Sequence, residues 1–219
     1  MTVTLQHPEA LEIWEDNADT RFFGGDQEWF ARHRSRLDGC GPTSAANLTA
    51  YLAHTRPALR SLYGGEDMRR TQFASHMEEM YSFVTPGNMG INRVEMFVDG
   101  MDAFLKHRAL PLTPHVFPVY SALRRNRPPV SELKAFVQKG IAEDCPIAFL
   151  NLSRGREQKL QNWHWITLVS AEEQDGKLIA CASDEGKHIC FDLGLWYLST
   201  VMQGGLVYYS DPPMHARSN

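Results

Sequence analysis

The residues best suited to chemistry lie in one short segment, LDGCGPTSAAN (residues 37–47). It places Cys40 on a glycine-flanked turn, two residues before Pro42, which suits the first turn of a helix. The N-terminus of a helix carries a partial positive charge, which favours a thiolate over a thiol. Glycine on both sides also leaves backbone N–H groups free to face an oxyanion. The pattern predicts that Cys40 is a nucleophile.

Three segments resemble papain-like cysteine peptidases. GCGPTSAAN (39–47) looks like their nucleophile motif, in particular that of the branch containing bacteriocin leader-processing peptidases and their uncharacterised bacterial relatives. WHWITLV (163–169) is similar to the histidine segment of the family, and ASDEG (182–186) to its acid segment. The order Cys, His, Asp along the chain also agrees with the family.

The resemblance implies a catalytic triad of Cys40, His164 and Asp184. Cys40 would attack a carbonyl carbon as the thiolate, and His164 would take its proton and return it to the leaving group. Asp184 would orient the imidazole, with Asp192 as a rival for that role. Trp163 and Trp165 flank the histidine and are expected to line the cleft and exclude water.

The oxyanion donor departs from the family pattern. Papain-like peptidases usually carry a glutamine six residues before the cysteine, and that position is Arg34 here. Three donors stay open: Arg34 itself, Gln27 reaching in from a longer loop, and the backbone N–H of Cys40 with a different side chain. Loss of one oxyanion donor lowers the catalytic rate on the order of 10²–10³-fold.

Three functions follow from these residues. The first is a cofactor-free thiol hydrolase that cleaves a peptide or isopeptide bond. The second is a papain-like acyltransferase or transpeptidase, because phytochelatin synthase-like proteins have a similar C-G-P-T-S segment. The third is a catalytically inactive module that binds peptides, because glutamine is absent at position 34.

Composition excludes several other classes of protein. The 219 residues contain 22 Lys and Arg against 26 Asp and Glu, and neither sign forms a long block, which argues against a nucleic-acid or anionic-membrane partner. Neither G-x-G-x-x-G nor a P-loop occurs, so we expect no nucleotide cofactor. We expect no metal either, because H-x-x-x-H, H-x-H and C-x-x-C spacings are missing. The expected partner is a peptide or protein substrate.

The sequence also predicts where the protein works. No apolar run approaches the 18 or more residues of a membrane span, and the start MTVTLQHP lacks the features of a secretory signal. We therefore expect a cytoplasmic protein whose four cysteines are reduced thiols. The oligomeric state stays open.

Hydrophobic periodicity predicts an α+β fold in a single domain, 1–219. A mainly helical lobe covers about 1–144 and an antiparallel sheet lobe about 145–210, with the cleft between them in the papain-like two-lobe manner. Whether residues 1–30 join the core or cover the cleft stays open. The expected helices are 43–54, 70–83, 92–107 with Asn92 as N-cap, and one from Ser131 to 143–144; the expected strands are 145–152, 163–170, 178–182, 188–191 and 206–209. The stretch 111–118 is expected to be a turn, and tight turns are expected at 175–176 and 185–186.

Overall fold

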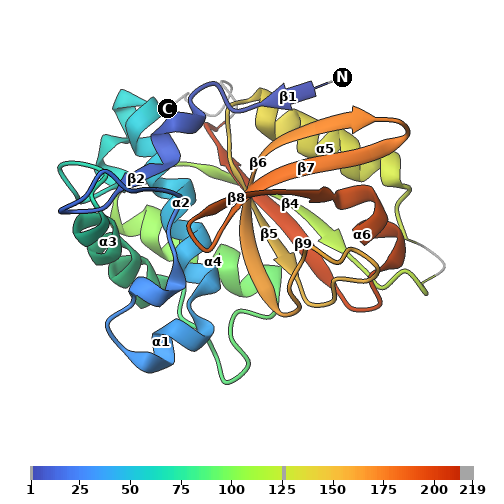
Figure 1. Ribbon diagram of the computed structural model, residues 1–219, viewed down its shortest axis with the longest axis horizontal. Coiled ribbons are helices and arrows are strands. Elements are labelled where there is room, and N and C mark those ends of the chain that lie inside the picture. The colour runs from blue at the N-terminus through green and yellow to red at the C-terminus, as the bar shows by residue number, and fades with distance from the viewer. Residues whose placement is uncertain (1, 125–126, 213–219) are drawn as a thin grey trace, which may run out of the picture.

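The computed structural model describes residues 2–124 and 127–212, and its centre is a seven-stranded antiparallel sheet (Figure 1). Six strands follow the order β4-β9-β5-β6-β7-β8, and β1 pairs with the far half of β6. The strands are β1 (Thr2–Thr4), β4 (Thr113–Val119), β5 (Ile147–Asn151), β6 (His164–Gln174), β7 (Lys177–Asp184), β8 (Lys187–Asp192) and β9 (Gly204–Ser210).

Helices cover both faces of this sheet. On β9, Gly205 faces Val94 of α4 (Val94–His107), whereas Tyr208 faces Gly140 of α5 (Val130–Ala142). Because positions three apart on a strand point to opposite faces, α4 and α5 lie on opposite sides. Helix α2 (Cys40–Thr55) packs on β5 and β6, and α6 (Leu193–Ser199) packs on β7. In Figure 1 the helices α2, α3 (Arg70–Phe83) and α4 lie to the left of the sheet.

Helix α2 is the buried centre of the helical part. Every residue from Gly41 to Ala53 is buried, and four of these positions are alanine, which lets neighbouring elements approach closely. A helix that is buried all round must be apolar or small on every face. The short elements around it are α1 (His33–Asp38), the 3₁₀ helices η1 (Pro8–Leu11), η2 (Gln27–Trp29) and η3 (Pro57–Leu62), and the hairpin of β2 (Glu12–Trp14) and β3 (Arg21–Phe23). Within the described ranges, no helix has the length and apolar character needed to cross a bilayer.

The predicted α+β class with an antiparallel sheet is confirmed. The helix over 70–83 has the predicted bounds, and the others differ by a few residues at their ends. Helix α4 begins at Val94 after Arg93, so Asn92 is not its N-cap, and α5 begins one residue before Ser131. Both tight turns also occur: positive φ at Asp175, Gly176, Glu185 and Gly186 is what a type I′ hairpin turn requires.

Strand β4 is the main departure from the sequence prediction, because 111–118 was expected to be a turn. Pro114 and Pro118 interrupt the strand pattern, but β4 lies at the edge of the sheet, where β9 is its one partner strand among the described residues. Proline is tolerated on an edge strand because one row of N–H groups there has no partner strand. Strands β1 and β4 thus belong to the sheet although they lie within residues 1–144, which were expected to be mainly helical. Conversely, helix α6 lies within residues 145–210, which were expected to form the sheet.

The expectation of four reduced cysteines is wrong for one pair. Cys181 and Cys190 form a disulfide, whereas Cys40 and Cys145 are free thiols. The two bonded residues lie directly opposite each other in the β7–β8 register, with Cα atoms 4.0 Å apart. Their spacing in sequence does not reveal this, because only the strand register brings the two side chains together.

Candidate active site

Cys40 is the first residue of α2 and is partly exposed. The residues on both sides of Cys40 must be glycine, because other parts of the chain pack too closely for a side chain there. A Cβ on Gly39 would lie 2.3 Å from the carbonyl oxygen of Ser35, and a Cβ on Gly41 would lie 2.9 Å from the side chain of Ile91. The two glycines therefore let α1 and the chain around residue 91 approach the cysteine. The thiol is left at the positive end of a 16-residue helix.

His164 and Asp184 meet at one end of the sheet. His164 is the first residue of β6 and Asp184 the last of β7, and these antiparallel strands are neighbours. Only about a tenth of each side chain is exposed (10% for His164 and 9% for Asp184), and His164 Nε2 lies 2.7 Å from Asp184 Oδ1. That hydrogen bond leaves Nδ1 as the ring nitrogen available to another group. Helix α2 packs on β6, so that Cys40 lines the same small pocket as His164 and Asp184.

The surroundings of His164 favour its charged form. Burial by itself would lower the pKa of the imidazole, but the hydrogen bond to Asp184 and the interaction with the Cys40 side chain outweigh burial. The pKa of His164 is therefore raised well above its ordinary value. An imidazolium that persists at neutral pH stabilises a thiolate beside it, which is the charge state a cysteine nucleophile needs.

Gln27 lines the pocket that holds Cys40, His164 and Asp184. It begins η2, whose start is fixed by Asp26 accepting a hydrogen bond from the backbone N–H of Glu28. Among the described residues, Gln27 Oε1 is buried and has no hydrogen-bond partner. That oxygen is an acceptor, but the same side-chain amide carries the Nε2 N–H groups, which are donors of the kind an oxyanion requires. Gln27 thus brings a side-chain donor group to the pocket that contains the thiol.

Arg34 lies outside that pocket. Its Nε donates to Asp38 Oδ2 at 2.6 Å within α1, and Tyr81 donates to the other carboxylate oxygen of Asp38. Arg34 instead lines a second cavity, of about 300 Å³, that opens on another side of Cys40. Of the two side chains considered as oxyanion donors, the structure brings Gln27 to the histidine and leaves Arg34 away from it.

The second cavity is lined by both apolar and polar residues. Trp163, 41% exposed, borders it and adopts a left-handed backbone conformation, with φ of +57°. Trp165 lines the first pocket from inside and donates its indole N–H to the carbonyl of Ile91 at 2.7 Å. The two tryptophans that flank His164 thus face different cavities. Residues two apart within a strand share a face, but Trp163 lies before the start of β6 and its left-handed φ breaks the alternation. The other lining residues are Leu37, Asp38, Asn88, Met89, Gly90, Ile91 and Leu152.

Residues before Gln27 belong to the core, which answers the question left open for 1–30. Leu5, Leu11 and Ile13 are buried, as is Phe30 just after Gln27, and β1 joins the sheet. The turn of the β7–β8 hairpin holds the segment in place: Phe23 N–H donates to the carbonyl of Gly186, whose own N–H donates to the carbonyl of Gly25. The N-terminal segment therefore positions Gln27 against the same hairpin that carries Asp184.

Asn47, which is buried in α2, connects the N-terminal segment to the sheet through hydrogen bonds. Its Oδ1 accepts from the backbone N–H of Gly25 at 2.8 Å, and its Nδ2 donates to Thr167 Oγ1 at 3.1 Å and Ser183 Oγ at 3.3 Å. Gly24 completes the contact, because a Cβ there would lie 2.0 Å from Ser183 Oγ and its φ is +73°. One buried amide thus connects α2, the loop before Gln27 and two strands of the sheet.

Replacing Asn47 by alanine is expected to destabilise the fold. The change leaves the buried N–H of Gly25 without an acceptor and removes the donor to the hydroxyls of Thr167 and Ser183. Each buried polar group left without a partner lowers the free energy of unfolding by about 1–3 kcal/mol. We expect a loss of about 3 kcal/mol in the free energy of unfolding, measured by urea denaturation. Asn17→Ala, at an exposed position, is the matched control and should change this value by less than about 0.5 kcal/mol.

Asp192, the rival considered for the orienting acid, makes a different contact. Its Oδ1 accepts a hydrogen bond from the backbone N–H of Leu195 at 2.8 Å and caps α6. Its position at the end of β8 makes it a helix cap, a role for which aspartate is a preferred residue. Of the two aspartates, Asp184 is the one that is hydrogen-bonded to His164 in the described part of the chain.

Two groups of three side chains in the described ranges have donor atoms close enough to hold a metal ion, within 4.8 Å of one another. One consists of His164, Asp184 and Glu185, and overlaps with the candidate triad. A cation there would have to replace the hydrogen bond between His164 Nε2 and Asp184. The other group consists of Cys181, His188 and Cys190 on the β7–β8 hairpin. The sequence search for metal spacings missed both groups, because their residues come together through strand pairing.

Comparisons of this chain with protein-family models, with curated proteins and with solved structures find no match.

Proposed function

We propose that this protein is a cofactor-free thiol hydrolase of papain-like, two-lobe architecture that cleaves a peptide or isopeptide bond. The observation that carries the proposal is the convergence of three side chains from three elements. Cys40 at the start of α2 lines one pocket with His164, which is hydrogen-bonded at 2.7 Å to Asp184. Nucleophile, base and orienting acid are the parts that acyl transfer through a thiol requires.

The reaction begins with attack of the Cys40 thiolate on the substrate carbonyl carbon. The carbonyl oxygen becomes an oxyanion, which accepts hydrogen bonds from the Gln27 side chain and from N–H groups at the start of α2. Imidazolium His164 then gives its proton to the leaving nitrogen, and the C–N bond breaks to leave a thioester on Cys40. His164 next takes a proton from water, whose oxygen attacks the thioester and releases the acid and the thiolate.

The two cavities beside Cys40 orient the substrate. The leaving nitrogen must lie near His164, which protonates it, so the acyl part extends away from the histidine. The cavity of about 300 Å³ contains Cys40 and Trp163 but not His164, and it offers that space. Ile91 and Leu152 line it and are nearly fully buried, and these apolar side chains favour an acyl part with an apolar side chain beside them.

Product analysis separates hydrolysis from acyl transfer. The full chain is incubated with a mixed peptide library, with and without an added primary amine, and products are identified by mass spectrometry. New carboxyl termini in both samples support the hydrolase. Products in which the amine replaces water, formed in preference to acids, favour the acyltransferase, and no product at all favours a peptide-binding module.

Metal removal is expected to leave turnover unchanged. In the proposed mechanism the nucleophile is Cys40 and no step uses a cation, so excess EDTA should alter the initial rate of the disulfide form by less than about 2-fold. The measurement is peptide cleavage before and after dialysis against the chelator. A loss of activity that Zn²⁺ restores would instead place a catalytic ion on His164, Asp184 and Glu185.

A further inference from the structure

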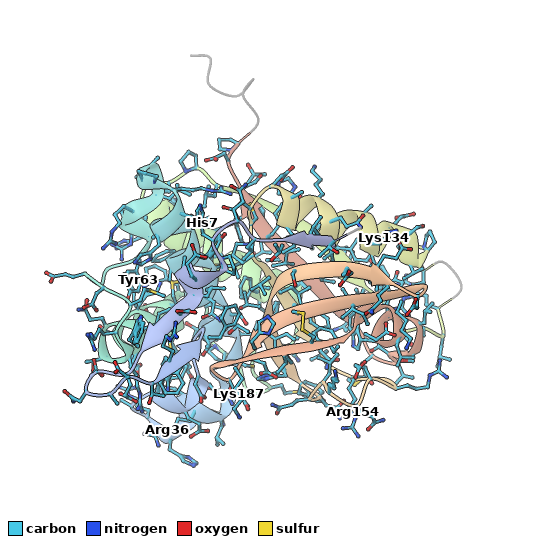
Figure 2. All side chains as sticks on the ribbon, turned by 45° about the horizontal axis from the view of Figure 1, so that its top comes forward. His7, Arg36, Tyr63, Lys134, Arg154 and Lys187 are labelled. Carbon is cyan, nitrogen blue, oxygen red and sulfur yellow. A yellow bond between two sulfur atoms is a disulfide. The ribbon has the colours of Figure 1, made fainter. Side chains whose placement is uncertain are left out.

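The β7–β8 hairpin presents a second set of reactive side chains, outside the candidate triad. Cys181 on β7 faces Cys190 on β8, and His188 lies two residues before Cys190. Residues two apart on a strand share a face, so the three side chains lie on the same face of the hairpin. Figure 2 shows the disulfide as a yellow bond in this part of the sheet, and Lys187 is labelled at the start of β8.

The donor atoms of this group have the composition of a zinc site. Two sulfurs and an imidazole nitrogen lie within 4.8 Å of one another, which suits ligands about 2.0–2.3 Å from one shared ion. His188 is exposed, and its ring packs edge-on against Phe23 at 5.0 Å between centroids, which fixes the ring beside the two cysteines. The cysteines are partly exposed, so an ion can reach the group from solvent.

We propose that reduction of the Cys181–Cys190 disulfide converts this face of the hairpin into a binding site for one Zn²⁺, held by the two thiolates and His188. A dithiol reductant supplies two electrons and two protons, which break the S–S bond to give two thiols, while the dithiol is oxidised to its own disulfide. Binding of Zn²⁺ then releases the two thiol protons, and water completes the tetrahedral shell.

Oxidation and metal binding are thus alternatives at the same two sulfur atoms. The disulfide form has no thiolate to offer, and the zinc form has no thiol to oxidise. A reducing environment favours the dithiol and therefore the metal-binding form. The site is independent of the proposed hydrolase activity, because none of Cys40, His164 and Asp184 is a ligand.

The test is zinc binding by the full chain in two redox states. After treatment with dithiothreitol and its removal under anaerobic conditions, we expect one equivalent of Zn²⁺ by equilibrium dialysis, and less than about 0.1 equivalent for the disulfide form. Co²⁺ serves as a second probe, because its thiolate complexes absorb in the near-ultraviolet. His188→Ala and Cys181→Ser should each weaken binding on the order of 100-fold or more, since each removes one of three protein ligands.

Cys40→Ala is the matched control, because Cys40 is the other partly exposed cysteine and lies beside a histidine. It should still bind one equivalent when reduced. His188→Ala keeps both cysteines and the disulfide, so its oxidised form reports whether the fold is intact by circular dichroism. The proposal is overturned if the reduced protein binds no zinc, if His188→Ala binds as tightly as the unaltered chain, or if Cys40→Ala abolishes binding.

Discussion

Replacing Cys40 by alanine is expected to abolish peptide cleavage, with a loss of at least about 10⁴-fold in kcat/KM. Removal of the nucleophile leaves only the oxyanion donors and substrate binding, which by themselves provide a small part of the rate enhancement of such enzymes. Cys40 is partly exposed at the N-terminus of α2, so alanine fits there without opening a buried cavity. The measurement is cleavage of the best peptide from the library, with thermal unfolding as the check on folding.

Cys145→Ala is the control for this change. Cys145 is the other free thiol, but it is buried beside Arg56, whose Nη2 lies 3.2 Å from the sulfur. Arg56 follows the C-terminal end of α2, about 24 Å along the helix from Cys40. This variant should keep its activity, even where it lowers stability. If Cys40→Ala still cleaves peptide at a comparable rate, Cys40 is not the nucleophile.

Replacing Gln27 by alanine is expected to lower kcat on the order of 10²–10³-fold with little change in KM. The reason is that an oxyanion donor acts mainly on the transition state, where negative charge develops on the carbonyl oxygen. Gln27 lines the triad pocket, and its buried Oε1 has no partner among the described residues, so its loss breaks no hydrogen bond of that atom. Steady-state kinetics on one peptide measure both parameters.

Arg34→Ala is the matched comparison, because both side chains are candidates for the same role from the sequence. Arg34 lines the larger cavity and pairs with Asp38, so its removal should act on KM and change kcat by less than about 10-fold. The opposite result is a large fall of kcat in Arg34→Ala and an unchanged kcat in Gln27→Ala. It would mean that Arg34 is the oxyanion donor, and it would contradict the positions of the two side chains in different pockets.

The sequence predicted the parts of this site that depend on local pattern. A cysteine between glycines before a helix-starting proline predicts the start of α2, and the apolar run after His164 predicts β6. Asp184 was chosen over Asp192 only through a resemblance, and the structure supports that choice because β6 and β7 pair so that His164 and Asp184 lie at one end.

What the sequence could not supply depends on contacts between distant segments. Gln27 reaches the pocket because the chain before it bonds to the turn at Gly186, a contact across about 160 residues that no local spacing encodes. The Cys181–Cys190 bond likewise depends on strand register. Strand β4 was missed because Pro114 and Pro118 are turn signals, and only its edge position makes them compatible with a strand.

The most direct test of the central claim is the pH dependence of iodoacetamide alkylation at each free cysteine, read by mass spectrometry in the native protein and in His164→Ala. Because the pKa of His164 is raised by Asp184 and Cys40, the imidazolium stays charged across the neutral range and stabilises the thiolate. We predict rapid alkylation of Cys40 below about pH 7, lost in His164→Ala, with Cys145 slow in both. Alkylation of Cys40 no faster than that of Cys145, or unchanged without His164, would contradict the thiolate–imidazolium pair and the proposed function with it.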